Sequence, residues 1–182
     1  MRIALIYRWC IVLMLGLVAQ PILAQGQKNS RRNENYTPTM KGTPGYYDKT
    51  VRHLFRQGLW GTGKKLLDEG LSKYETVSAL NELMGSYWLH YKKYDKARYF
   101  LIRSLRDDNK NPQTLQMLMK VEEMTQHYSS AIVYCNQLLE LAPYEYTLWR
   151  KKIELYRLQG NNVEAIKMLK RLGEILQDRK RC

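Results

Sequence analysis

Residues 84–101 read MGSYWLHYKKYDKARYFL, and this stretch contains the pattern that decides the fold. Its alanine, Ala97, has counterparts at Ala131 and Ala165, so that the two steps along the chain are equal in length. Around these alanines, apolar residues recur at intervals of three and four, which is the spacing of one face of an α-helix. A 34-residue period of this kind is typical of stacked helix–turn–helix repeats.

The same period places matched residue types around the alanines. Tyr94 and Tyr128 each stand three residues before an alanine, and one period before Ala97 the chain has Gly63, preceded by Trp60. Small residues let two helices approach closely, and aromatic rings fill the wedge beside such a contact. These positions therefore predict the contact between the two helices of each repeat.

On these residues, the chain resembles the tetratricopeptide repeat family, whose pattern is Trp-x2-Leu-Gly-x2-Tyr, then Ala-x3-Phe, then Pro. The matching residues in the last three repeats are Met84-Gly85, Trp88, Tyr94, Ala97 and Leu101; Leu115, Leu118, Tyr128, Ala131, Cys135 and Pro143; and Trp149, Tyr156, Gly160, Ala165 and Leu169. The first repeat is the most degenerate, with Tyr47, Leu54, Gly58, Trp60, Gly63 and Leu67. Two departures stand out, because Lys152-Ile153 replaces Leu-Gly and Glu122 replaces a Tyr.

The resemblance implies an all-α fold, an α-solenoid of about four helix–turn–helix repeats coiled into a right-handed superhelix with a concave groove. The expected repeats are 44–77, 78–111, 112–145 and 146–179, within a repeat domain at 44–182. The expected helices are 45–58, 61–73, 78–91, 95–106, 112–125, 129–141, 146–158 and 162–176. Gly58 and Gly160 should provide the left-handed turns that end two of them.

Residues 1–24 have the form of a secretory signal peptide of bacterial type. Arg2 and Arg8 precede and flank the apolar run 9–19, and Ala24 is a small residue suited to cleavage. The alternative is a signal anchor that stays in the membrane, although the run is shorter than the roughly 20 apolar residues of a spanning helix. We expect cleavage after about Ala24 and a periplasmic or envelope-associated protein.

The segment 25–43 is polar and lacks periodic apolar positions, so we expect a disordered tether. Cleavage after Ala24 would leave Cys135 and Cys182, and we do not expect them to form a disulfide, because Cys135 falls on a predicted buried stripe. The whole chain has a formal net charge of +13. Positive charge attracts nucleic acid, but a signal peptide directs a chain to export, so we do not expect nucleic acid as a partner.

No catalytic, metal or cofactor site is expected. Residues 58–65 read GLWGTGKK and match the phosphate-binding pattern G-x4-G-K, but Lys65 stands where that pattern needs Ser or Thr for magnesium. His53, His90 and His127 have no Cys or His three or four residues away, whereas zinc sites have clustered ligands. We therefore expect a protein that is not an enzyme.

The resemblance implies instead that a protein partner binds in the concave groove lined by the first helix of each repeat. Transferred by register, the groove residues are Arg52, Arg56, Glu82, Ser86, Gln113, Gln116, Lys120, Arg150, Glu154 and Arg157. Their charges are mixed, which suggests a polar peptide or a partner helix. The other interpretation is a solvated helix face with no ligand.

The helix expected at 162–176 offers another surface. Ala165, Leu169, Leu172 and Leu176 form its predicted inward stripe, and Ile166, Met168 and Ile175 widen the apolar arc. Helical arrays usually end in a polar capping helix, but only residues 177–182 follow this apolar one. We therefore expect this end to dock either onto a partner or onto a second copy, and the second case would give a homodimer.

A cluster of basic residues supports an alternative function. The cluster comprises Lys167, Lys170, Arg171, Arg179, Lys180 and Arg181, with Lys28, Arg31 and Arg32 in the tether. Such clusters attract anionic lipid headgroups and acidic polymers. The alternative to a groove-binding adaptor is therefore an envelope module that binds anionic lipid or polysaccharide through its basic end, with peripheral membrane association.

Overall fold

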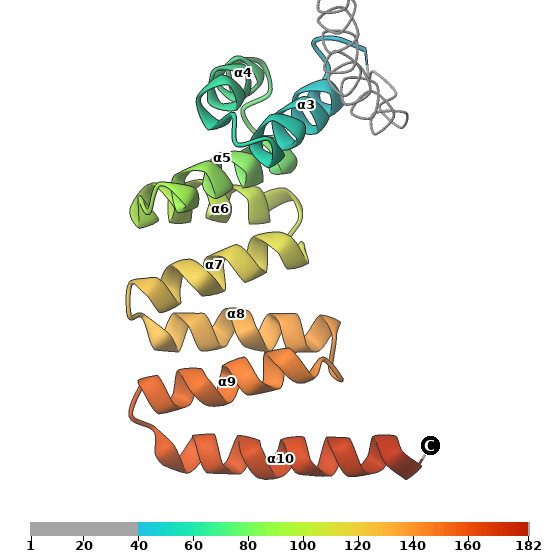
Figure 1. The fold of residues 1–182 in the computed structure, drawn as a ribbon, viewed down its shortest axis with the longest axis vertical. Coiled ribbons are helices and arrows are strands. Elements are labelled where there is room, and N and C mark those ends of the chain that lie inside the picture. The colour runs from blue at the N-terminus through green and yellow to red at the C-terminus, as the bar shows by residue number, and fades with distance from the viewer. Residues whose placement is uncertain (1–39, 182) are drawn as a thin grey trace, which may run out of the picture. The chain divides into compact units, whose positions relative to one another are not determined.

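The computed structural model describes residues 40–181, and these residues form eight α-helices and no strand (Figure 1). The helices are α3 (Pro44–Arg56), α4 (Trp60–Lys73), α5 (Ser78–His90), α6 (Tyr94–Asp107), α7 (Pro112–Met124), α8 (Tyr128–Leu141), α9 (Tyr146–Leu158) and α10 (Asn162–Arg181). Each begins and ends within two residues of the range expected from the sequence, apart from α10, which continues to Arg181. The predicted all-α repeat fold is confirmed.

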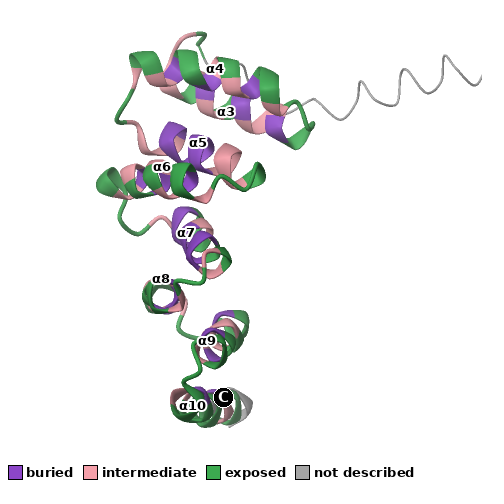
Figure 2. Ribbon diagram, turned by 90° about the vertical axis from the view of Figure 1, so that its left-hand side faces the viewer, coloured by how far each residue is buried: buried purple, intermediate pink, exposed green. Residues whose placement is uncertain are grey.

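Helices that are adjacent in sequence are also adjacent in space. α3 packs on α4, α5 on α6, α7 on α8 and α9 on α10, and each pair packs on the next pair. The first helices of neighbouring repeats also meet directly, α3 with α5 and α5 with α7. In Figure 2 the buried residues of α7, α8 and α9 lie on the sides that face neighbouring helices. The core is thus a continuous stripe shared between repeats.

The turn inside each repeat has one backbone conformation, set by register. Gly58, Lys92, Gln126 and Gly160 occupy the same position in the four successive repeats, and all four have positive φ, at 76°, 55°, 62° and 81°. In the first turn the Gly58 amide donates to the Phe55 carbonyl and the following amide to the Leu54 carbonyl, and the other three turns repeat this pair of bonds. This motif closes the C-terminal end of a helix. The expected turns at Gly58 and Gly160 are confirmed, and two more occur without glycine.

The column of small residues lies at the predicted contact between the two helices of a repeat. Ala97 and Ala131 are completely buried, Ala165 is nearly so, and Gly63 is buried in the first repeat. A Cβ atom on Gly63 would come within 2.6 Å of the Phe55 ring, so the first repeat requires glycine where the others accept alanine. The departure from alanine at this position is therefore explained by a larger neighbour.

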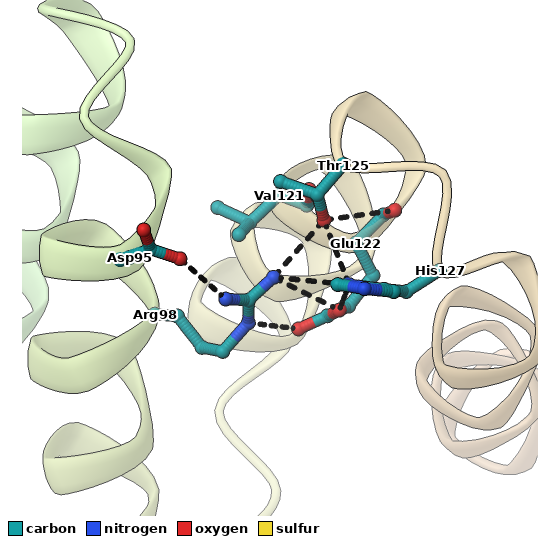
Figure 3. A network of polar contacts seen from close by, with 6 residues as sticks. All are labelled: Asp95, Arg98, Val121, Glu122, Thr125 and His127. Atoms are coloured by element: carbon teal, nitrogen blue, oxygen red, sulfur yellow. Dashed lines mark hydrogen bonds and ion pairs between the residues drawn. The ribbon is translucent and has the colours of Figure 1, made fainter.

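Glu122, the residue that replaces an expected tyrosine, joins two repeats (Figure 3). Its buried carboxylate accepts from Arg98 of α6, at 2.6 Å from Nε and 3.2 Å from Nη2. Thr125 Oγ1 accepts from the same guanidinium, and His127 Nδ1 lies 3.1 Å from Glu122 Oε2, the oxygen that also accepts from Arg98 Nη2. Hydrogen bonding to Glu122 raises the pKa of Arg98. A buried ion pair thus takes the place of an aromatic ring.

The expected signal peptide at 1–24 and most of the expected tether at 25–43 lie outside the described residues, as does Cys182. Within the part that is described, no helix has both the length and the hydropathy needed to cross a membrane.

Candidate protein-binding groove

The first helices of the repeats, α3, α5 and α7, together form a hollow of about 430 Å³, here called the central hollow. Six residues predicted for the groove line it: Arg52, Glu82, Ser86, Gln113, Gln116 and Lys120. Apolar side chains of Leu83, Leu89 and Met117 complete its wall. The shared register of the repeats therefore brings together residues of three different helices, as the resemblance implied.

A second hollow, of about 660 Å³, lies over α9 and α10. The predicted residues Arg150, Glu154 and Arg157 line it, together with Tyr146, Lys151 and three apolar residues of α9 and α10, Ile153, Leu169 and Leu172. Arg56 lines neither hollow and is exposed, with its Nε donating to the backbone carbonyl of Arg52. The predicted groove residues other than Arg56 are thus divided between the central hollow and this second hollow.

Glu82, predicted as a partner-binding residue of the groove, is buried and is bound by other residues of the protein. Its side chain is only 4% exposed; one carboxylate oxygen accepts from Arg52 at 2.9 Å and the other from Thr114 at 3.3 Å. Thr114 in turn contacts Ser104, which contacts Ser78. This buried chain of hydrogen bonds links α3, α5, α6 and α7, so Glu82 holds the groove helices in register.

The carboxylates along the first helices are already paired within the protein. Arg52 binds Asp48 as well as Glu82, and Lys151 binds both Glu123 and Glu154. Burial opposes the charge of Arg52, but the two carboxylates outweigh this effect and raise its pKa. Lys151 shows the same balance: burial lowers its pKa, but its two glutamates raise the pKa by more, so that it lies above its ordinary value.

In the described part of the chain, the acidic side chains of the groove are in ion pairs, whereas several of its basic side chains are not. Among the described residues, Lys120 and Arg157 are in no ion pair, and Arg150 lies over the ring of Tyr146 at 5.5 Å. The mixed charge read from the sequence therefore becomes a surface whose acids are neutralised internally and whose unpaired charges are positive. Such a surface attracts acidic groups.

One aromatic feature at the edge of the central hollow was not anticipated. The rings of Trp60 and His90 stack at 3.9 Å with an angle of 11° between their planes. Both rings line a hollow that shares Ser86, Leu89 and Lys120 with the central hollow. The two residues do not stand one full period apart, so a search at the repeat spacing does not detect the pair.

The outer face of α10 differs from the sequence prediction. Leu169 and Leu176 were expected to face inward, but they are 57% and 40% exposed. Met168 is half-buried against Ile153, Ala165 and Leu172, and Ile175 is half-buried as well. The inward stripe is therefore 165, 168, 172 and 175. Of the three residues predicted for docking, Ile166 is the exposed one, at 58%.

The sequence match to a phosphate-binding loop has no matching geometry. Residues 58–65 span a helix-ending turn and the first turn and a half of α4, and Lys64 is ion-paired with Asp68 at 2.6 Å. No strand precedes this segment within the described range 40–181. In that same range, His, Cys, Asp and Glu side chains form no group of three that could hold a metal ion.

Comparison with known proteins supports the fold. No protein-family model matches the chain, and no curated protein matches it. Among solved structures, MamA AMB-1 is 20% identical over 75% of this chain and 80% of that chain, with a TM-score of 0.65. Another crystal structure of MamA is 15% identical over 86% and 87% of the two chains, with a TM-score of 0.67. At these identities the match shows a shared tetratricopeptide-type helical fold.

Proposed function

We propose that this chain is a non-catalytic scaffold that binds a segment of a partner protein in the central hollow. The hollow combines apolar walls with amide, hydroxyl and ammonium groups contributed by three helices. Concave sites with apolar walls and a few polar groups are the usual form of a recognition site. The fold shared with MamA is compatible with this role but does not establish it.

The observation that carries the proposal is the arrangement of Ser86, Gln116 and Lys120. These three residues, from α5 and α7, line one hollow, and no described residue hydrogen-bonds or ion-pairs with their side chains. By contrast, Arg52 and Glu82 at its floor are bound to each other. The hollow therefore has a fixed floor and polar groups still available to a ligand.

Site-specific photo-crosslinking tests this proposal. A photoreactive amino acid in place of Gln116 should capture one or a few proteins in the native cells, and Lys120→Glu should reduce that capture. The matched control carries the same probe at Val133, which is 52% exposed on α8 and lines none of the hollows. Identical products from both positions, or products unaffected by Lys120→Glu, would contradict groove binding.

The location of the protein is part of the same proposal. The basic start, apolar run and Ala24 of the segment 1–24 support export to the periplasm or envelope, with an envelope protein as the partner. Expression with a C-terminal tag, followed by fractionation and mass spectrometry of the N-terminus, tests this: a mature chain beginning near Gln25 is expected. An intact Met1 in the cytoplasmic fraction would contradict export.

Two of the basic residues invoked for the lipid-binding alternative are ion-paired within α10. Lys167 lies 3.6 Å from Glu164, and Arg171 lies 2.8 Å from Glu174. Exposed pairs of this kind are weak, so they reduce the local positive potential without removing it. For this reason we place the groove, and not the basic helix, at the centre of the proposed function.

A further inference from the structure

Comparison of the four repeats with one another identifies a second surface, at α9 and α10, which we call the α9–α10 face. It consists of the hollow over these two helices and the neighbouring Ile166. Leu169 belongs to a column with Leu67, Leu101 and Cys135, which hold the same register position in the three earlier repeats. The three earlier members are completely buried, whereas Leu169 is 57% exposed.

The first helix of the following repeat is what buries the earlier members. Leu67 clusters with Leu80 and Leu83 of α5, and Leu101 clusters with Leu118 and Val121 of α7. Cys135 clusters with Leu148 and Leu155 of α9, and its thiol donates to the Leu148 carbonyl at 3.4 Å. No described residue does this for Leu169, since its repeat's own cluster is confined to α9 and α10.

A second column shows the same change. Ile132 is 7% exposed within the cluster that joins α8 and α9, and Ile166, one period later, is 58% exposed. Arg98, one period before Ile132, reaches Glu122 on the next repeat's first helix. This register position therefore contacts a following first helix wherever one is present. Both columns thus indicate that the α9–α10 face has a site for one further helix, here called the seat.

The charges around this seat select the kind of helix. Residues 146–177 contain seven Lys or Arg and three Glu, a net charge of +4. Two surfaces with this same charge would repel each other if a second copy docked face to face. An acidic helix would instead be attracted. A bilayer surface has acidic headgroups but no helix that could fill a hollow between two helices.

The position of Arg157 indicates where a docked helix would form an ion pair. Glu123 of α7 accepts from Lys151 on the first helix of the next repeat, at 3.0 Å. Arg157 stands one period after Glu123, lines the α9–α10 hollow and is in no ion pair among the described residues. A docked helix in the same register would therefore place a side chain opposite Arg157, and a carboxylate there would complete an ion pair with the charges reversed.

We propose that the α9–α10 face binds an acidic amphipathic helix of a partner protein, seated where the first helix of a following repeat would lie. Apolar residues two turns apart cover Leu169 and Leu172, as Leu148 and Leu155 cover Cys135 and Leu138 one repeat earlier. A carboxylate on the same helix binds Arg157. This surface is separate from the central hollow and from the partner proposed there.

A charge-swap binding experiment tests the proposal. The probe is a peptide of residues 145–159, bridged on its outer face to hold it helical, in which Lys151 is replaced by Glu. Its affinity for the full chain is measured by fluorescence anisotropy against the unsubstituted peptide. The substituted peptide, whose formal charge is 0 against +2 for the unsubstituted one, should bind about fivefold more tightly, as expected for one exposed ion pair. The protein variant Arg157→Glu should reverse this order.

Two controls separate the seat from general attraction by a basic protein. Leu169→Glu, at an exposed position, should weaken binding of the Lys151→Glu peptide by at least about tenfold while leaving the circular dichroism spectrum unchanged. The same probe with Leu148 and Leu155 replaced by Ser should bind as weakly. Equal binding of all peptides, or an unchanged affinity for Leu169→Glu, would overturn the proposal.

Two further measurements test whether a second copy of the chain or a membrane, instead of a partner helix, occupies the α9–α10 face. A dimer in sedimentation velocity that Leu169→Glu dissociates would assign the face to a second copy. Binding to anionic phosphatidylglycerol vesicles that requires Leu169 would assign it to a membrane. Either result overturns the partner-helix proposal. Neither bears on crosslinking from Gln116, because Gln116 lies in the central hollow.

Discussion

Arg98 and Glu122, on helices of neighbouring repeats, form a two-bond ion pair in which the carboxylate is almost completely buried. The Nε–Oε1 distance is 2.6 Å, and the side chains are 24% and 6% exposed. Neither residue fits the repeat pattern, so the pair is specific to one joint, between α6 and α7. The packing of neighbouring repeats therefore depends on contacts that occur once as well as on contacts that recur in every repeat.

Arg98→Ala should lower the free energy of unfolding by about 1–3 kcal/mol, because it leaves the buried Glu122 carboxylate without its charged donor. Denaturant titration followed by circular dichroism measures this. Arg103→Ala is the matched control, since Arg103 pairs with Glu75, whose side chain is 73% exposed. It should change stability little. Equal losses in the two variants would show that burial of the pair is unimportant.

Gly85→Ala should destabilise the protein, because the new Cβ would lie 2.5 Å from Leu101 Cγ in the core. Overpacking of this kind typically costs about 1–3 kcal/mol. Gly173→Ala is the control within α10, where a Cβ meets nothing within 4 Å. It should stabilise by about 0.5–1 kcal/mol through helix propensity. Thermal melts of both variants distinguish these opposite signs, and a shift in the same direction would refute the packing argument.

Gln126→Gly should stabilise the turn between α7 and α8. Gln126 is exposed and has φ of 62°, a left-handed conformation that Gly58 and Gly160 adopt without steric strain at the equivalent turns. Relief of that strain, less the extra entropy of glycine in the unfolded chain, should amount to about 1 kcal/mol or less. The chemical-denaturation midpoint measures it. Gln126→Ala keeps the strain and should give no increase.

Cys135 should be unreactive in the folded protein. Burial raises the pKa of its thiol from 9.0 to about 11, so the nucleophilic thiolate is scarce at pH 8. In a variant with Cys10 and Cys182 replaced by Ser, a thiol reagent should label Cys135 only after denaturant is added. Rapid labelling of the native protein would contradict the buried position.

The same shift predicts a pH dependence of stability. The folded state holds the proton more tightly than the unfolded state, so the contribution of Cys135 is fully present below about pH 9 and is lost as pH rises toward 11. Cys135→Ala removes a buried Sγ atom but should also flatten this part of the stability curve. An unchanged slope between pH 9 and 11 would mean that other groups cause it.

The groove illustrates how far register alone can predict a site. Ser86, Gln116 and Lys120, which the repeat period assigned to one surface, line one hollow, because every repeat orients its first helix in the same way. Register does not predict which side chains bind each other. Glu82 was therefore expected among the partner-binding residues, but it is buried between Arg52 and Thr114, residues 30 and 32 positions away.

The sequence by itself determined the number and type of the described helices and, apart from the end of α10, their limits, since each depends on local periodicity, turns and caps. The tertiary structure alone decided which charges are neutralised and which apolar residues remain exposed, since both depend on a neighbouring repeat. Leu169 shows the difference. Its residue type and spacing match those of buried Leu101, but burial requires a further helix packed against it, and that contact is absent among the described residues.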